Sequence, residues 1–161
     1  MRYQGGKSRI AKPIAQIIMQ VAGGDCFVSL FCGSCAVESK VQGFSRKLLN
    51  DRHEYLIAML QGVQQGYNLP EHITLEQYRY IRENKDADPV LAGFVGFGCS
   101  FGGKWFGGYA RNKTGTIWCP FDTEESNFVK LLSQYAACGV SVIHSHIATG
   151  GGLFPMCPAC L

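Results

Sequence analysis

The stretch C-F-V-S-L-F-C-G-S-C-A-V, from Cys26 to Val37, decides the fold of this chain of 161 residues. Its first part, Cys26 to Phe31, is a nearly continuous apolar run, which is typical of a strand buried in a parallel sheet. A glycine-containing turn follows, and we expect a helix from about Ala36. Lys47 to Asn50 predicts a second strand that ends on Asp51. This alternation indicates a βαβ unit with a right-handed crossover.

Helices are expected on both sides of this unit. Ser8 can cap a helix that ends at Gly23 and Gly24, and Pro13 is compatible with its first turn. The apolar positions of this helix recur at helical spacing: Ile10, Ile14, Ile17, Ile18 and Val21. The segment after the second strand, from Glu54 to Gly66, also predicts a helix.

Beyond Gly66 the alternation gives way to helices. Thr74 and Gln77 have the spacing of a capping box, and Leu75, Tyr78 and Ile81 share one face of the helix that would follow. Asp88-Pro89 predicts the start of a further helix through Val90, Leu91, Phe94 and Val95. The next segment, Gly96 to Gly115, is too rich in glycine for a regular helix, and we expect it to contact the substrate.

Composition limits the class of protein. A chain with 47% hydrophobic residues is long enough for one sizeable core, and its net charge of +3 permits a nucleic-acid partner without requiring one. We find no signal peptide and no apolar run long enough for a membrane span, so we expect a cytoplasmic protein.

Eight cysteines are many for such a chain, and buried free thiols are the simplest interpretation. Two CxxC pairs occur, Cys32 with Cys35 and Cys157 with Cys160. They lie much farther apart than the two pairs of a structural zinc site, so we predict no metal.

The tail has a different composition. Ser126 to Leu161 contains no carboxylate side chain, and Lys130 is its one charged residue. Our hypothesis is that this tail is translated out of frame or is a degraded gene end. We therefore divide the chain into a cofactor-binding half-domain (1–66), a helical insert rich in glycine, aromatic and basic residues (67–118) and an atypical tail (119–161).

The turn after the first strand and the end of the second strand predict a ligand site. In an open parallel sheet, ligands bind outside the carboxyl ends of the strands. Gly33 lets the backbone approach a ligand closely. Asp51 follows 18 positions later, where a carboxylate can accept hydrogen bonds from both hydroxyls of a ribose. The pattern indicates a nucleotide-like cofactor.

Three motifs in sequence order then carry a resemblance: R-Y-Q-G-G-K from Arg2 to Lys7, F-C-G-S-C-A-V from Phe31 to Val37, and L-N-D ending at Asp51. Together they resemble the opening of the Dam-type adenine-specific DNA methyltransferases, over roughly Met1 to Gly115. The resemblance implies a Rossmann-like core, dependent on S-adenosylmethionine, with an incomplete parallel sheet and a target-recognition insert.

On that resemblance Tyr3 and Lys7 contact S-adenosylmethionine, Phe31 and Gly33 line its methionine side, and Asp51 binds its ribose. The alternatives are that Lys7 is an ordinary solvated lysine and that Tyr3 covers the edge of the core. The chain also departs from the family pattern. Ser29 and Leu30 stand where Glu-Pro usually precedes the phenylalanine, which removes a partner for the amino group of the cofactor, and Cys35 replaces a second glycine.

The insert interleaves aromatic and cationic residues between glycines: Phe101, Lys104, Trp105, Phe106, Tyr109, Arg111 and Lys113. Cations neutralise phosphates, and aromatic rings stack on bases. The resemblance implies double-stranded DNA with a flipped adenine as the partner. We therefore predict DNA contacts from Lys104, Trp105, Tyr109, Arg111 and Lys113. The alternative is a glycine loop whose aromatic rings are tucked into the core.

The family performs catalysis with D-P-P-Y or a close variant, and this chain contains no Asp-Pro-Pro. Val140 to Ile147 has the position of the strand that would carry the motif, but Ala-Thr-Gly follows it. His144 and His146 would share one face of that strand, and we interpret them as ordinary polar residues. Two functions are therefore expected: a truncated methyltransferase of the kind carried by phages and restriction systems, inactive alone, or a binding module for S-adenosylmethionine or DNA.

Overall fold

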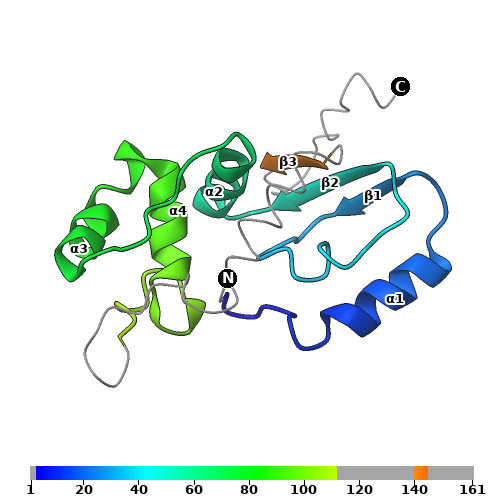
Figure 1. Ribbon diagram of the computed structural model, residues 1–161, viewed down its shortest axis with the longest axis horizontal. Helices are drawn as coiled ribbons and strands as arrows, with labels where there is room; N and C mark the ends of the chain where they lie inside the picture. The colour runs from blue at the N-terminus through cyan, green and yellow to red at the C-terminus, as the bar shows by residue number, and fades with distance from the viewer. Residues whose placement is uncertain (1–2, 112–139, 145–161) are drawn as a thin grey trace, which may run out of the picture.

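The computed structural model describes residues 3–111 and 140–144, which form an α/β structure around a parallel sheet. Strands β1 (Cys26–Ser29), β2 (Arg46–Asp51) and β3 (Val140–His144) lie in the order β1-β2-β3. All three strands run in one direction and point toward the helices α2 and α4 (Figure 1). Their carboxyl ends therefore meet at one edge of the sheet, where ligands of such sheets bind.

The third strand comes from the tail. Its predicted range is confirmed for Val140–His144, and it pairs with β2 so that Asp51 lies beside His144 in the register. The rest of the predicted strand, and the other tail residues, lie outside the described residues. The out-of-frame hypothesis stays a prediction.

The crossover from β1 to β2 differs from the expected helix. Hydrogen-bonded turns occupy the segment instead, with the Ser39 amide donating to the Cys35 carbonyl over 3.0 Å. The ammonium of Lys47 donates to the carbonyl oxygens of Glu38 at 3.3 Å and Val41 at 2.6 Å. These side-chain bonds satisfy carbonyls that a longer helix would have paired internally, so the chain can return to β2 after one turn.

Helix α1 (Ala11–Val21) is present as expected, but its start differs and only part of its predicted apolar face is packed. Ser8 does not cap it: Ile10 stands at the N-cap position and no side chain accepts a hydrogen bond there. The helix buries Ala11 and Ala15, whereas Ile17 is 59% exposed. Ile14 and Ile18 lie on the same face as the alanines and are half-buried, so the periodicity predicted the helix and part of its packed face.

The other helices are α2 (Glu54–Gln64), α3 (Leu75–Glu83) and α4 (Pro89–Gly98), with short 3-10 turns η1 (Lys85–Ala87) and η2 (Phe101–Gly103). The capping box of α3 is confirmed, since both of its reciprocal hydrogen bonds form. Asp88 caps α4 by accepting a hydrogen bond from the Leu91 amide at 2.9 Å. These signals placed the helix starts correctly because each satisfies an amide that the helix leaves unpaired.

Helix α4 continues further into the glycine-rich segment than we expected. It includes Gly96 and Gly98, because the glycines of α4 serve close packing rather than a flexible loop. A Cβ atom on Gly93 would lie 2.0 Å from the Tyr55 carbonyl oxygen of α2, and one on Gly96 would lie 2.2 Å from the Trp105 ring. Neighbouring groups occupy the space that side chains would need.

One hydrophobic core joins the sheet, α2, α3 and α4. Its members come from both sides of the expected boundary at residue 66: Leu49, Leu56, Ile57, Met59, Leu60, Tyr78, Ile81, Phe94 and Val95 are among them. The half-domain and the start of the insert therefore share a core in which α2 packs between the sheet and α4. Within the described ranges, no helix has the length and apolar character needed to cross a membrane.

Candidate functional site

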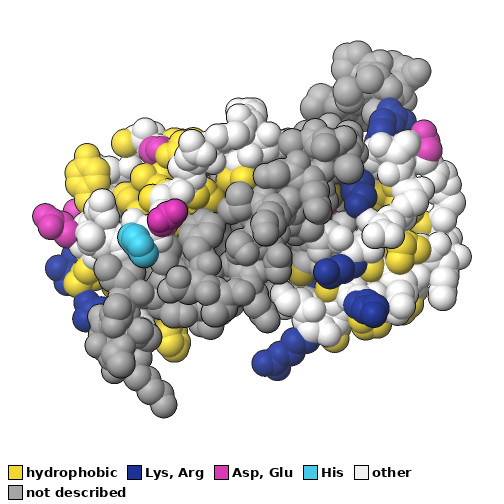
Figure 2. Space-filling model, viewed as in Figure 1, with side chains coloured by type: hydrophobic (Ala, Val, Ile, Leu, Met, Phe, Trp, Pro, Cys, Tyr) yellow, Lys and Arg dark blue, Asp and Glu magenta, His cyan; other side chains and the backbone are white. Residues whose placement is uncertain are grey.

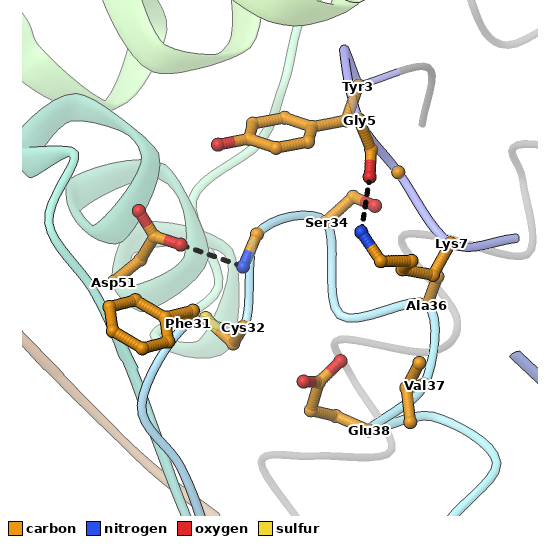
Figure 3. A pocket seen from close by; sticks show the side chains of 12 residues that line it. Tyr3, Gly5, Lys7, Phe31, Cys32, Ser34, Ala36, Val37, Glu38 and Asp51 are labelled. Carbon is orange, nitrogen blue, oxygen red and sulfur yellow. Dashed lines mark hydrogen bonds between the residues drawn. The ribbon is translucent and has the colours of Figure 1, made fainter. Parts of the chain in front are cut away.

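A cavity of about 370 Å³ opens at the carboxyl ends of β1 and β2 (Figure 3). Three segments that are distant in sequence form its walls: the N-terminal segment, the turn after β1 and the end of β2. The five residues predicted to bind the cofactor all line it: Tyr3, Lys7, Phe31, Gly33 and Asp51. The other lining residues are Gly5, Gly6, Cys32, Ser34, Ala36, Val37 and Glu38.

The carboxylate of Asp51 fixes the turn on which the cavity is built. Its Oδ2 accepts a hydrogen bond from the Gly33 amide at 2.9 Å, and its Oδ1 accepts one from the His53 amide at 3.0 Å. A carboxylate has about four acceptor positions, so roughly two remain for a ligand. Asp51 can therefore hold the turn and accept ligand hydroxyls at the same time.

Gly33 and Tyr3 lie in contact across the cavity wall. Gly33 has a φ of +50°, and a Cβ atom there would lie 3.2 Å from the Tyr3 ring. The Tyr3 ring also packs against Phe97 of α4 at a centroid distance of 5.0 Å. Next to it, the Gln4 amide donates to the Gly103 carbonyl at 3.0 Å. The N-terminal segment is thus held between the turn and α4, where it closes one side of the cavity.

The electrostatic environment keeps the Tyr3 phenol neutral. Burial, followed by the negative charge of Asp51, raises the pKa of Tyr3 to about 12. The neutral hydroxyl remains a hydrogen-bond donor at physiological pH. In Figure 3 the phenol lies on the same side of the cavity as Asp51.

Lys7 and Phe31 provide the exposed parts of the wall. The Lys7 ammonium donates to the Gly5 carbonyl at 3.2 Å, which curls the side chain back over its own segment. The Phe31 side chain is exposed over 74% of its surface although it lines the cavity. An aromatic ring in that position offers a free face to a flat or apolar part of a ligand.

Glu38 is a cavity residue that sequence reasoning missed. It is only 6% exposed, and its Oε1 accepts a hydrogen bond from the Ser29 hydroxyl at 2.6 Å. Burial raises the pKa of Glu38, and the hydrogen bond from Ser29 partly opposes that effect. The sequence did offer a signal, because Glu38 is one acid within a run of small and apolar residues. The expected helix from about Ala36 did not indicate which face this acid would occupy.

The two thiols of the first CxxC pair are free and buried, as the simplest interpretation expected. A hydrogen bond with Cys32, followed by burial, raises the pKa of Cys35 well above its usual range. A thiol in that state stays protonated, whereas zinc binds thiolates. Among the residues described here, no three His, Cys, Asp or Glu side chains gather as metal ligands. Cys157 and Cys160 lie outside that part.

The insert divides into packed rings and exposed cations. Trp105 is half-buried, stacks on Tyr55 at 5.2 Å and meets the edge of His53 at 4.3 Å. Tyr109 is also half-buried, and its hydroxyl donates to the Ile73 carbonyl. These contacts agree with the alternative in which the aromatic rings are tucked into the core, although both rings stay partly exposed, so the DNA contacts of Trp105 and Tyr109 stay a prediction.

Lys104 and Arg111 are exposed, and so is Phe101, which shows 74% of its surface. Lys113 lies outside the described residues. From Phe101 to Arg111, where the described part of this segment ends, the exposed side chains are therefore two cations and an aromatic ring that was not among the predicted DNA contacts.

A cavity of this kind, at the carboxyl edge of a parallel sheet and beside an acid that ends the second strand, is typical of α/β proteins that bind nucleotide-like cofactors. A family model for the D12 class N6 adenine-specific DNA methyltransferases matches residues 3–91, more than half of the chain, and the chain belongs to this family. The matched residues include the whole lining of the cavity. The search of curated proteins gave no match.

Membership confirms the resemblance seen in the sequence. The family is one of enzymes that methylate the N6 nitrogen of adenine in DNA, and methyltransferases of this type generally use S-adenosylmethionine. At the level of the family, the substrate is DNA and the reaction is methyl transfer.

Proposed function

We propose that this chain binds S-adenosylmethionine in the cavity between the N-terminal segment and the strand ends, within a Rossmann-like core whose sheet is incomplete. The observation that carries the proposal is that five residues chosen from three separate sequence motifs line a single cavity. Unrelated surface residues drawn from positions 3 to 51 would have no reason to converge. The convergence supports a common ligand.

The cavity suits this cofactor in size and chemistry. Ligand pockets usually enclose about 300–1,000 Å³ and combine apolar walls with a few placed polar groups. Here Phe31 and Val37 supply apolar surface, while Asp51 and Glu38 supply acceptors. S-adenosylmethionine, when bound, supplies a methyl group on a positively charged sulfur. Asp51 would hold the ribose hydroxyls, and Tyr3 and Phe31 would enclose the less polar parts.

We further propose that the chain alone does not transfer the methyl group. Transfer to adenine requires groups that hold the amino nitrogen in line with the methyl carbon, which is mainly a matter of positioning and electrostatics. The Asp-Pro-Pro element that does this in the family does not occur in the sequence. The function supported best is cofactor binding by a methyltransferase family member that is inactive by itself.

Isothermal titration calorimetry with S-adenosylmethionine tests the proposal. We expect binding by the wild type and at least about tenfold weaker binding by Asp51→Asn, because an amide cannot accept at all the positions of the carboxylate. Asp25→Asn is the matched control, since its side chain is 74% exposed beside Arg46. No heat from a folded wild-type sample would refute the proposal. With radiolabelled cofactor and unmethylated duplex DNA, we expect no transfer, and clear transfer would refute the second part.

A DNA contact through the insert is a separate proposal. Lys and Arg side chains gather over the part of the molecule that contains α1 and β1 (Figure 2). Charge alone therefore does not favour the insert over that face. The insert adds Phe101, an exposed ring three residues before the exposed Lys104. An exposed ring beside a cation can stack on a displaced base while the cation contacts a phosphate.

Fluorescence anisotropy with a labelled duplex can locate the contact. Replacing Lys104 and Arg111 by Gln should reduce the slope of log affinity against log salt by about two, since each phosphate contact contributes about one. The matched control replaces Arg9 and Lys12, two exposed cations at α1, by Gln. An unchanged slope for the first pair, with a reduced slope for the second, would place the contact at α1 instead.

A further inference from the structure

Glu38 places a buried carboxylate in the wall of the cavity. The carboxylate accepts a hydrogen bond from the hydroxyl of Ser29, the last residue of β1, at 2.6 Å. Figure 3 shows the carboxylate directed into the cavity from the wall formed by the turn after β1, while Asp51 enters from another wall. Two acids therefore face one cavity from different segments.

Burying a carboxylate is unfavourable unless a partner compensates for the lost water. Within residues 3–111, no Lys or Arg forms an ion pair with Glu38; the ammonium of Lys47 lies nearby but bonds to backbone carbonyls. Burial raises the pKa of Glu38, hydrogen bonds from Ser29 and from the backbone at Glu38 and Val37 partly oppose that effect, and the charge of Asp51 adds a smaller upward shift. A cation supplied by a ligand would offset the burial and the charge of Asp51, so the cavity is suited to a ligand with a positive group at this end.

We propose that Glu38 recognises the cationic amino group of the cofactor and that Ser29 positions the Glu38 carboxylate for this contact. The inference rests on the proposed function, because it assigns an end of the cavity to a group of the same ligand. A contact from Glu38 would also replace the acid that this sequence lacks at the end of the first strand. Ser29 stands where the family pattern has an acid, and its hydroxyl holds an acid delivered from nine residues later at the same strand end.

Two ligands with the same adenosine and a neutral sulfur separate the contributions. S-adenosylhomocysteine carries the amino group, and 5′-methylthioadenosine lacks it. In calorimetric titrations, the Glu38→Gln variant should bind S-adenosylhomocysteine about tenfold or more weakly than the wild type, as expected for loss of a hydrogen bond to a charged group. Its affinity for 5′-methylthioadenosine should change by less than about twofold. Glu71→Gln, at an exposed position, is the matched control.

The role of Ser29 is tested by a pair of variants that also covers the case in which Glu38→Gln does not fold. Ser29→Ala should lower the preference for S-adenosylhomocysteine over 5′-methylthioadenosine, and Ser29→Thr, which keeps the hydroxyl, should retain it. If Ser29 has a purely structural role, Ser29→Ala should lower the affinity for both ligands equally and leave the preference unchanged.

The outcomes distinguish this inference from the proposed function. If the wild type binds neither ligand, the proposed function fails and the inference fails with it. The proposed function stands if the wild type binds both ligands and Asp51→Asn lowers the affinity for both. In that case, the assignment of Glu38 is wrong if Glu38→Gln leaves both affinities unchanged or lowers them equally.

Discussion

Replacing Gly93 by alanine should destabilise the protein even though alanine is the better helix former. Gly93 lies where α4 crosses α2, and the added Cβ atom would sit 2.0 Å from the Tyr55 carbonyl oxygen and 2.8 Å from the Met59 Cβ atom. Such atoms do not approach within 3.0 Å, so the two helices must separate by about 1 Å. The obstacle is backbone, and no change of rotamer removes it.

The magnitude follows from two opposing terms. Alanine gains at most about 1 kcal/mol of helix propensity over glycine. Overpacking a tight core typically costs about 1–3 kcal/mol, and a clash with backbone belongs at or above the upper end. We expect a net loss of about 2 kcal/mol or more for Gly93→Ala. For a chain of this size that corresponds to a melting temperature about 4–8 °C lower.

Thermal and urea unfolding followed by circular dichroism measure this loss. Gly62→Ala on α2 is the matched comparison, because its Cβ atom would meet the side chain of Val90 at 2.6 Å rather than backbone. Truncation of Val90 to alanine should therefore restore much of the stability lost in Gly62→Ala. No such second change should rescue Gly93→Ala. A Gly93→Ala protein as stable as the wild type would refute the close crossing of α2 and α4.

Three further predictions concern single hydroxyl and carboxyl groups. Tyr78→Phe removes a buried hydroxyl that lies 2.8 Å from the Ser100 hydroxyl, so urea unfolding should show a loss of about 1–2 kcal/mol, and an unchanged midpoint would contradict that bond. Asp88→Ala removes the cap of α4 and should lower the free energy of unfolding by about 1 kcal/mol, whereas Asp88→Asn should lose less; equal losses would argue against capping. The raised pKa of Tyr3 means that its neutral form is favoured in the folded state, so its contribution to stability is complete below about pH 10 and is lost as pH rises toward 12. Absorbance titration at high pH, compared with Tyr3→Phe, should show this phenol ionising later than exposed tyrosines, and ionisation at the usual pH would contradict its environment.

The sequence predicted those elements whose signals are local. The capping box at Thr74 and the cap at Asp88 placed two helix starts, because a side-chain acceptor satisfies a specific backbone amide. The apolar run before Gly33 predicted β1, although the strand ends at Ser29 and is not buried as expected, since Val28 is 49% exposed. The acid that ends β2 was placed at the same edge of the sheet. Gly33 and Asp51 could be chosen from this geometry, whereas Tyr3, Lys7 and Phe31 were chosen from the resemblance to the methyltransferase family; all five line the cavity.

The sequence could not predict features that depend on packing between segments. Gly96 looked like part of a loop, but it lies in α4 because the Trp105 ring occupies the space of its missing side chain. Ile17 had the spacing of a buried residue, yet α1 packs through its alanines. Glu38 entered the cavity because the crossover forms turns rather than a helix. Each outcome depends on a partner distant in sequence.

The central claim is that S-adenosylmethionine binds at the turn after β1. Titration of the ¹⁵N-labelled protein with this cofactor, followed by NMR, tests the location directly. We expect the amide signals of Gly5, Gly6 and Gly33 to shift, while those around Tyr80 stay in place. A second cavity of about 460 Å³ lies beside Tyr80 on α3 and serves as an internal comparison. Shifts at Tyr80 with none at Gly33, or no shifts at saturating cofactor, would contradict the claim.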